Sequence, residues 1–478
     1  MEKAEEKVEL VFFPVPGIGH LISAVELAKS LFKHHPLFSI TVLLMPLPSP
    51  VIDAYVQSVA ALDLRFLTLP PLPEPDDTQG PENFISLFVD SYMPLVKDAI
   101  QEIKATHRHC HRRLGGLVID LFSTALIDVG AELGIPTYVY FTSGAAALGL
   151  MLRLPALHHE IPCEFADFQG EVEVAGLLPL PHSAMPAPIQ NKKGEGYRWF
   201  VHHGRRFREA QGIIVNTFAE LEPRVCDAIA GGRCLPPDHL TPSIFPVGPV
   251  LALEQPPQSI SSGLFEWLDA QPHESVVFLC FGSAGAFSAP QIAEIAAGLE
   301  QSGHRFLCSM RSRPKERYVG LVDGDLDQVL PDGFLERTKG RGLMWPSWLP
   351  QVAVLAHPAV GGFVSHCGWN STLESLWFGV PILAWPLYAE QRLNAFELVK
   401  DYGVAVELRL GSGADEVVSA VEVERGVRCL MGESEEGVNV RRKVKEMGEA
   451  GRKAVEEGGS SSASLARLVD VLASNAKA

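Results

Sequence analysis

The chain has 478 residues, is 47% hydrophobic and carries a formal net charge of −17 at pH 7. This length allows two substantial cores, and the acidic charge disfavours nucleic acid and anionic membrane as partners, because both bind basic surfaces. Eight scattered cysteines without a CxxC pair are typical of reduced thiols, and neither a signal peptide nor an apolar run of membrane-spanning length is visible. We therefore expect a monomeric cytoplasmic protein without a membrane span.

Strands and helices alternate along the first half of the chain. Apolar runs predict buried strands at Val8–Phe13, Ile40–Leu44, Leu117–Ile119 and Tyr138–Phe141, separated by helices at Leu21–Phe32, Phe84–Ile103 and Thr124–Leu133. This order is typical of a doubly wound parallel sheet. Loops are expected around Pro70–Pro81, Leu150–Gly170 and Leu178–Gly196, where they would form the walls of a binding site.

A candidate general base follows the first of these strands. The segment PVPGIGH ends in His20 at a strand-to-helix turn, where open α/β sheets bind ligands. A single histidine at a helix start is more often a capping or packing residue. Asp120, however, ends a different buried strand, and the carboxyl ends of parallel strands share one edge of the sheet. A carboxylate there can hold one ring nitrogen while the other accepts a proton.

The second half repeats the alternation. Strands are predicted at Ser275–Phe281, Arg305–Met310, Gly361–Val364, Pro381–Ala384 and Val404–Leu408, with a helix at Gln291–Ser302. The proline, glycine and serine content after Phe245 is typical of an interdomain linker. We predict an N-terminal domain over residues 1–247, a linker over 248–262, a second domain over 263–457 and a terminal helix within 458–478.

The window from Trp348 to Gln391 combines several elements that can hold a nucleotide. A short strand and a tight turn lead into a helix that starts near Asn370 and Ser371, and the start of a helix favours anions such as phosphate. Both residues could instead only cap the helix. Glu374 lies one turn later and points back toward the same place, where a ribose diol could bind. Trp348 offers a flat face for a base, and Gln351 an amide edge.

This window resembles, without a gap, the nucleotide-sugar signature of the plant UDP-dependent glycosyltransferases, the family-1 enzymes of GT-B fold. The resemblance implies two Rossmann-like domains that face each other across a cleft, with the terminal helix packed back on the first. It implies that Trp348 stacks on uracil, that Gln351 and Glu374 hold the ribose, and that Glu390 and Gln391 hold the sugar. The diphosphate would be bound by His366, Asn370, Ser371 and Ser283, and further donor contacts would come from Gly19, Thr142, Leu349, Gly368, Trp369 and Tyr388.

The resemblance also implies a reaction. His20 and Asp120 match the family's catalytic pair, so His20 would deprotonate an acceptor hydroxyl, which displaces UDP from the anomeric carbon with inversion. Gln391 and Trp369 are typical of members that use UDP-glucose. Neither a metal nor another cofactor is expected beyond UDP-glucose as co-substrate.

The expected partner is a small plant phenolic, such as a flavonoid or phenylpropanoid. Ser23 and the segment GHLISAVELAK weakly favour a subgroup that acts on phenolics. A terpenoid or hormone acceptor, or another UDP-sugar as donor, remains an alternative. A flat aromatic acceptor would meet apolar side chains near the site, although each of them could be ordinary core: Ile18, Phe122, Phe141, Leu180 and Met185.

Other site types fit the sequence less well. Gly17 and Gly19 begin a dinucleotide fingerprint, but Ile22 replaces its third glycine, which disfavours an NAD-dependent oxidoreductase. The segment after position 281 also resembles the nucleophile elbow of α/β-hydrolases, but that motif needs a glycine at the position of Phe281. The histidines and cysteine of residues 107–111 lie among arginines that would repel a metal ion. A non-catalytic UDP-sugar-binding protein remains, and an intact His20 and Asp120 argue against it.

Overall fold

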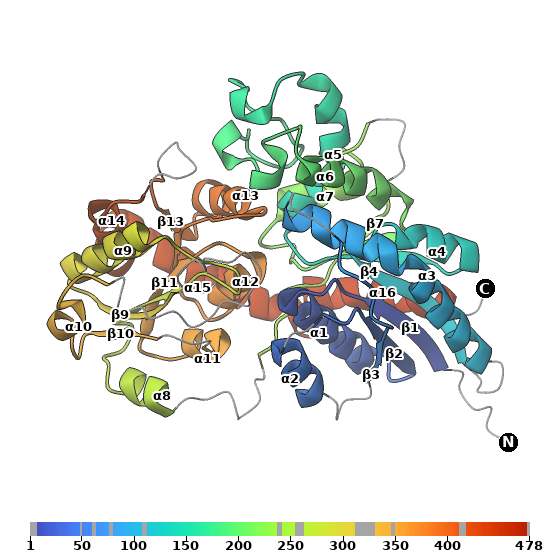
Figure 1. Cartoon of the computed structure of the whole chain (residues 1–478), viewed down its shortest axis with the longest axis horizontal. Helices are drawn as coiled ribbons and strands as arrows, with labels where there is room; N and C mark the ends of the chain where they lie inside the picture. Colours follow the sequence, from blue (N-terminus) through green and yellow to red (C-terminus); the bar gives the residue numbers. More distant parts are fainter. Residues whose placement is uncertain are drawn as a thin grey trace. The chain divides into compact units, whose positions relative to one another are not determined.

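The computed structural model describes residues 7–47, 50–59, 64–75, 80–107, 112–236, 241–253, 262–310, 330–345, 349–410 and 417–475. Within it the chain forms two compact units (Figure 1). The first unit comprises Met1–Ala252 and Lys453–Ala478, and the second comprises Leu253–Arg452. The domain boundaries inferred from the sequence, at residues 247, 262 and 457, stay predictions.

The first unit contains a seven-stranded sheet in the order β3-β2-β1-β4-β5-β6-β7, and every pairing is parallel. Its interior strands are nearly continuous apolar runs because helices cover both faces of the sheet. In β1, for example, Leu10 and Phe13 are fully buried. The strands are β1 (Lys7–Phe13), β2 (Phe38–Leu44), β3 (Leu64–Thr68), β4 (Arg112–Asp120), β5 (Thr137–Phe141), β6 (Gly212–Val215) and β7 (Ser243–Pro246).

Eight α-helices of this unit lie within the described residues: α1 (Ile18–His34), α2 (Pro50–Ser58), α3 (Pro81–His107), α4 (Leu126–Leu133), α5 (Ala145–Glu160), α6 (Glu195–Arg206), α7 (Pro223–Ala230) and α16 (Ser460–Asn475). A loop was predicted at Leu150–Gly170. This prediction is wrong over residues 150–160, because α5 continues to Glu160. This helix is buried on most of its circumference and contains Pro155, so its sequence lacks the apolar stripe that reveals a surface helix. Short 3₁₀ helices occur at Phe165–Asp167, His182–Ala184, Ala187–Ile189 and Phe207–Glu209.

Helix α16 at the end of the chain belongs to the first unit (Figure 1). Its Leu465, Leu468 and Leu472 pack in one buried cluster with Leu10 of β1. Asn475 Nδ2 donates to the backbone oxygen of Gly115 at 3.1 Å and to Tyr138 Oη at 2.8 Å. The first unit is therefore completed by a helix that begins more than 200 positions after the last strand of its sheet.

Truncation of one side chain tests how much α16 contributes to this core. Leu468 is fully buried, so Leu468→Ala is expected to destabilise the first unit by about 2–5 kcal/mol through lost burial and a residual cavity. Urea unfolding measures this loss. The control is Asp470→Ala, which changes an exposed residue two positions later and should stay within about 0.5 kcal/mol of the wild type. Equal stability of the two variants would contradict the packing role.

The second unit contains a six-stranded parallel sheet in the order β10-β9-β8-β11-β12-β13. Its strands are β8 (Val276–Cys280), β9 (Arg305–Ser309), β10 (Gly342–Met344), β11 (Val360–Ser365), β12 (Ile382–Ala384) and β13 (Ala405–Glu407). Its helices are α8 (Ser262–Asp269), α9 (Ala289–Ser302), α10 (Phe334–Arg337), α11 (Gln351–Leu355), α12 (Trp369–Trp377), α13 (Gln391–Phe396), α14 (Ala420–Met431) and α15 (Glu435–Val455), with a π-helical turn at Glu397–Asp401.

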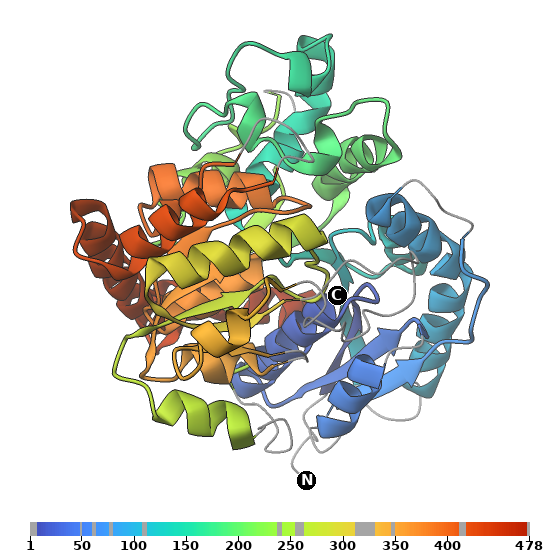
Figure 2. The same ribbon diagram turned by 60° about the vertical axis from the view of Figure 1, so that its left-hand side comes forward.

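Close packing of α9 against α14 depends on a glycine. A Cβ atom on Gly298 of α9 would lie 2.6 Å from Val423 Cβ of α14, so only glycine allows this approach. Figure 2 shows α9, in yellow, running across one face of the sheet. The predicted α/β class, with two parallel sheets flanked by helices, is confirmed.

Both sheets reverse their strand order at one point. In the first sheet the reversal lies between β1 and β4, and in the second it lies between β8 and β11. Connections leave in opposite directions at such a point, and the carboxyl ends of the two strands border a crevice where ligands bind. The residues that follow these four strands are therefore the main candidates for a ligand-binding site in each unit.

Candidate active site

His20 and Asp120 meet at the reversal point of the first sheet. His20 is the third residue of α1, which follows β1, and Asp120 is the last residue of β4. His20 Nδ1 lies 2.6 Å from Asp120 Oδ2. The Asp120 side chain is 2% exposed, whereas the His20 side chain is 29% exposed. A buried carboxylate thus holds one ring nitrogen of a histidine that remains partly accessible.

The Asp120 carboxylate is itself held in place. Its Oδ1 accepts a hydrogen bond from the backbone N–H of Phe122 at 3.1 Å. With Oδ2 accepting from Nδ1–H, the imidazole takes the tautomer in which Nε2 is the basic nitrogen. This is the arrangement of a general base with an orienting carboxylate.

A second contact fixes the helix that carries His20. Ser23, one turn later on α1, shares a buried hydrogen bond of 2.6 Å with the hydroxyl of Tyr140 on β5. Burial raises the pKa of Tyr140, so the phenol stays neutral. The sequence pointed to Ser23 only as a subgroup marker, and its partner could not be identified without the register of β5.

His366 lies at the reversal point of the second sheet, directly after β11. Its ring lies between two glycines, since a Cβ atom on Gly282 or Gly368 would stand 2.6 or 2.4 Å from Nε2. Burial lowers the pKa of His366 to about 4, which makes the imidazole neutral at pH 7. Its buried Nδ1 has no hydrogen-bond partner among the described residues. A neutral imidazole of this kind can donate a hydrogen bond from its N–H group to an anion. It carries no positive charge that would attract the anion.

Helix α12 begins three residues after His366, at Trp369. Its N-cap is Gly368, and no side chain caps it. Asn370 and Ser371 are the second and third residues of the helix, so the alternative in which they serve as its N-cap is wrong. The peptide N–H groups of the first turn attract anions. Trp369 itself is 4% exposed, and its side chain is mostly enclosed by the protein.

Gln351 forms hydrogen bonds with two other predicted donor-binding residues, Ser371 and Glu374. Its Nε2 donates to Ser371 Oγ at 2.8 Å and to Glu374 Oε2 at 2.6 Å. Burial raises the pKa of Glu374 to about 7, and the hydrogen bond from Gln351 partly opposes this rise. Three predicted ribose and phosphate residues therefore form one polar cluster. Leu349 is 3% exposed and packs in the core, and Trp348 lies outside the described residues.

Gln391 organises the turn before α13. Its Oε1 accepts from the backbone N–H groups of Leu387 and Tyr388, both at 2.9 Å. The amide oxygen is thus occupied within the turn, and Nε2 is the atom that can address a sugar hydroxyl as a donor. Glu390 and Tyr388 lie in the same turn and are partly buried, and Ser283 lies at the exposed turn after β8.

The candidate acceptor residues separate into two groups. Ile18 and Phe122 are partly exposed, and the Phe122 ring lies 6.2 Å from the His20 ring, centroid to centroid. Phe141 is 1% exposed and packs edge-on against Phe207. Leu180 and Met185 are fully buried as well. Of these five candidates, only Ile18 and Phe122 present apolar surface near His20.

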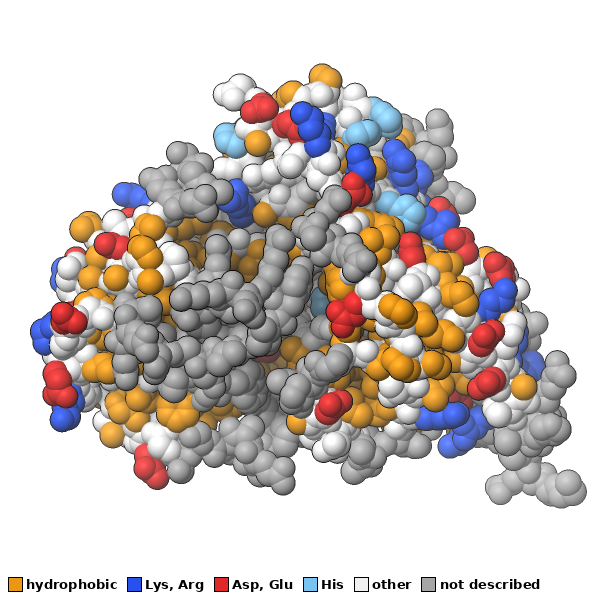
Figure 3. Space-filling view, in the orientation of Figure 1, with side chains coloured by type: hydrophobic (Ala, Val, Ile, Leu, Met, Phe, Trp, Pro, Cys, Tyr) orange, Lys and Arg blue, Asp and Glu red, His pale blue; other side chains and the backbone are white. Residues whose placement is uncertain are grey.

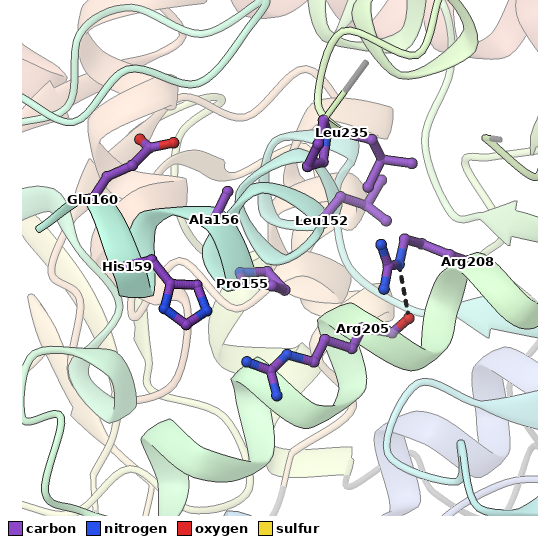
Figure 4. A pocket seen from close by; sticks show the side chains of 9 residues that line it. Leu152, Pro155, Ala156, His159, Glu160, Arg205, Arg208 and Leu235 are labelled. Carbon is purple, nitrogen blue, oxygen red and sulfur yellow. Dashed lines mark hydrogen bonds between the residues drawn. The ribbon is translucent and has the colours of Figure 1, made fainter. Parts of the chain in front are cut away.

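A surface pocket of about 370 Å³ lies elsewhere in the first unit (Figure 4). It is lined by Leu152, Pro155, Ala156, His159, Glu160, Arg205, Arg208, Leu235 and Pro236. None of these residues is a predicted site residue. The pocket adjoins the carboxyl-terminal end of α5, and this helix, with 16 residues, spans about 24 Å at 1.5 Å per residue. Thr142, which contacts His20, lies three residues before the other end of this helix.

The charge distribution on the surface, the helix composition and possible metal ligands concern the predicted absence of nucleic acid, membrane and metal partners. Acidic and basic side chains are interspersed over the described residues on the face drawn in Figure 3. None of the described helices combines the length and the apolar composition needed to cross a membrane. Among the described residues, no cluster of three or more His, Cys, Asp and Glu side chains has the geometry to hold a metal ion.

Comparison with known proteins identifies the family. Residues 234–425 match the family described as UDP-glucoronosyl and UDP-glucosyl transferase. Malvidin galactosylase UGT88C3 from Oryza sativa subsp. indica is 47% identical, over 97% of both chains. UDP-glucose flavonoid 3-O-glucosyltransferase 6 from Fragaria ananassa is 44% identical, over 98% of this chain and 99% of its own. The chain belongs to the plant family 1 UDP-glycosyltransferases.

The solved structures agree with this assignment. The structure of Medicago truncatula UGT71G1 complexed with UDP-glucose matches this UDP-glycosyltransferase with a TM-score of 0.84 and 41% identity, over 98% of each chain. The GT-B fold inferred from the sequence is thereby confirmed, and the NAD-dependent oxidoreductase alternative is wrong.

The glycines around His366 offer a test of its role in this UDP-glycosyltransferase. Gly368→Ala places a methyl group against the rigid imidazole ring of His366. Because no flexible side chain can move aside, the overpacking costs about 1–3 kcal/mol and should displace the ring. We expect UDP to bind about tenfold more weakly or worse, as measured by calorimetry. The matched control is Gly263→Ala, where the added methyl group meets no atom within 4 Å. Unchanged UDP affinity in Gly368→Ala would rule out a contact through His366.

Proposed function

We propose that this UDP-glycosyltransferase transfers glucose from UDP-glucose to a hydroxyl group of a small phenolic of the flavonoid class. The 2.6 Å hydrogen bond between His20 and Asp120 carries the proposal, because it supplies a base for a hydroxyl acceptor. The names of the relatives support the acceptor class, since one acts on malvidin and another on flavonoids. They differ in the sugar, which is galactose in the first and glucose in the second.

In the proposed mechanism, His20 Nε2 takes the proton of the acceptor hydroxyl while the oxygen attacks the anomeric carbon. Asp120 stabilises the imidazolium that forms. Attack from the face opposite UDP breaks the bond between the anomeric carbon and the phosphate oxygen, so an α-linked donor yields a β-glucoside. Phe122 and Ile18 would contact the acceptor ring.

The donor is assigned to the residues after β8 and β11. The negative charge that develops on the leaving diphosphate would be stabilised by the N–H groups at the start of α12, by the neutral His366 as a hydrogen-bond donor and by Ser283. Thr142 is assigned a contact with the sugar or a phosphate. Gln351 and Glu374 would hold the ribose, and Gln391 would donate from Nε2 to a sugar hydroxyl. These groups can carry the charge without a metal ion.

Substrate assays test both halves of the proposal. The purified protein is incubated with UDP-glucose or UDP-galactose and with a flavonol, an anthocyanidin or a simple phenol, and UDP release and product mass are recorded. We expect acceptor-dependent UDP release, a mass gain of one hexose, and faster turnover with UDP-glucose. Proton coupling at the anomeric carbon of the product distinguishes β from α. Consumption of neither donor with any phenolic would refute the assigned function, whereas preference for UDP-galactose would correct only the sugar.

A further inference from the structure

A buried carboxylate outside the proposed catalytic pair binds the start of α5. Glu222 lies between β6 and α7 and is 1% exposed. Its Oε2 accepts from the backbone N–H of Ala145 at 2.7 Å, and its Oε1 accepts from that of Ala146 at 2.8 Å. These are the first two residues of α5, whose own N-cap, Gly144, provides no side-chain cap. A negative charge at this position is stabilised by the helix dipole and by two charge-assisted hydrogen bonds.

The segment just before α5 reaches His20. β5 ends at Phe141, and Thr142 follows it, three residues before the helix. Thr142 is 8% exposed, and its Oγ1 lies 3.3 Å from His20 Nδ1. The Nδ1–H that donates to Asp120 thus has a second, longer contact with a hydroxyl. Together the two contacts define the rotation of the imidazole ring.

Glu222 is anchored firmly enough to act as a fixed point. The backbone N–H groups of Leu221 and Glu222 both donate to the backbone oxygen of Phe218, at 3.1 and 3.3 Å. The N–H of Asn216, at the end of β6, donates to the oxygen of Phe141 at 3.1 Å. The segment that carries Glu222 is therefore tied directly to the end of β5, from which Thr142 extends.

We propose that Glu222 is a positioning residue, whose buried carboxylate fixes the start of α5 and thereby holds Thr142 Oγ1 against the His20 imidazole. This inference rests on the proposed function, because it assigns Glu222 an effect through the base. A shift of about 1 Å in a catalytic contact can cost on the order of 100-fold in rate. Loss of one carboxylate oxygen is enough to release one of the two N–H groups.

The test compares Glu222→Gln with the matched variant Glu220→Gln. Glutamine keeps the size of the side chain but presents an NH₂ group, a donor, to one of the two helix N–H groups. Glu220 lies two residues earlier, is exposed, and contacts Ser460 at 2.8 Å rather than α5. We expect Glu222→Gln to lower kcat about 10–100-fold, with a smaller change in the KM for UDP-glucose, since Thr142 is one of several groups assigned to the donor. Glu220→Gln should stay within about threefold of the wild type.

A double-mutant cycle with Thr142→Val separates positioning from general stability. If Glu222 acts through Thr142, the threonine change lowers kcat in the wild type but has little further effect in Glu222→Gln. If Glu222 only stabilises the fold, the two effects multiply. Activities are measured well below each melting temperature, so that loss of folded protein does not enter. Should Glu222→Gln fail to fold, Glu222→Asp, which keeps the charge but is one methylene shorter, replaces it in the same cycle.

Two results would overturn the inference: a kcat of the Glu222 variant within threefold of the wild type, or independent effects of the two changes. The proposed function is judged separately, since it fails only if the wild-type protein shows no acceptor-dependent turnover of a UDP-sugar. A wild type that turns over UDP-glucose, together with a fully active Glu222 variant, would leave the proposed function intact and reject the positioning role alone.

Discussion

Replacement of His20 by alanine is expected to lower kcat by about 10²–10⁴-fold, the range that general-base catalysis contributes. UDP binding should be nearly unchanged, because His20 is not among the residues proposed to bind UDP, most of which follow β8 and β11 in the second unit. The acceptor hydroxyl would lose its proton acceptor, while the bound donor keeps its contacts. Steady-state kinetics give kcat, and calorimetry with UDP gives the binding constant.

The control for this variant is His34→Ala on the same helix. His34 is exposed, and its Nδ1 lies 2.9 Å from the backbone oxygen of Ser30, one turn earlier on α1. This change should leave kcat within about twofold of the wild type. Asp120→Asn provides a second arm: it removes the charge that stabilises the imidazolium and should lower kcat strongly without removing the base. Near-normal turnover in His20→Ala would exclude the proposed mechanism.

Replacement of Glu374 by glutamine is expected to weaken UDP binding and at the same time to stabilise the free protein above neutral pH. A charged hydrogen bond to a ribose hydroxyl contributes about 1.5–3 kcal/mol, which corresponds to about 10–100-fold in affinity. Without ligand, the same carboxylate is costly, because burial raises its pKa to about 7, against the lowering effect of the Gln351 hydrogen bond. The residue thus favours binding at the expense of stability.

The pH dependence follows from the direction of this shift. The folded-state pKa of Glu374 exceeds its unfolded value of 4.5, so the folded protein binds the proton more tightly. Its contribution to stability is complete below about pH 4.5 and is lost as the pH rises through about 7. Glu374→Gln cannot titrate. The variant and the wild type should therefore be nearly equally stable at pH 4, and the variant should be more stable at pH 8 by about 1–3 kcal/mol.

Thermal or urea unfolding at the two pH values measures this difference. His366 acts in the opposite direction, because its folded pKa of about 4 lies below the ordinary histidine value of 6.5, so stability rises as the pH increases through that interval. This effect is common to the variant and the wild type and cancels in their comparison. Glu336→Gln, at an exposed position of the same unit, is the matched control. A stability difference independent of pH would show that Glu374 does not titrate near neutrality.

Much of the fold could be predicted from apolar runs and their spacing. β1, β2, β5 and β8 are seven or fewer residues long and highly apolar, and the predicted ranges lie within two or three residues of the observed ends. The short strands β6 and β7 were not predicted. Each has only four residues, too few for a periodic signal to stand out from loop sequence. Helix α5 was not predicted, and a loop was expected from Leu150 onward, because the helix is apolar on nearly all sides and lacks an apolar stripe.

The candidate site was predictable wherever strand order alone determines position. Parallel strands deliver their carboxyl ends to one edge, so His20 after β1 and Asp120 at the end of β4 could be paired without coordinates. The same argument could not find Glu222, which caps a helix that starts 77 positions earlier in the chain. It also could not place Phe141, Leu180 and Met185, because burial depends on neighbours that are distant in sequence.

The sequence by itself determined the family, the two α/β units and the identity of the residues proposed for chemistry, because short-range patterns and an uninterrupted motif encode them. Only the tertiary structure decided the protonation of these residues. His366 is neutral because two glycines and the surrounding fold enclose its ring, and Glu374 titrates near pH 7 because the fold removes its carboxylate from water. Charge in a buried site depends on desolvation and on partners from other segments, and neither is encoded in local sequence.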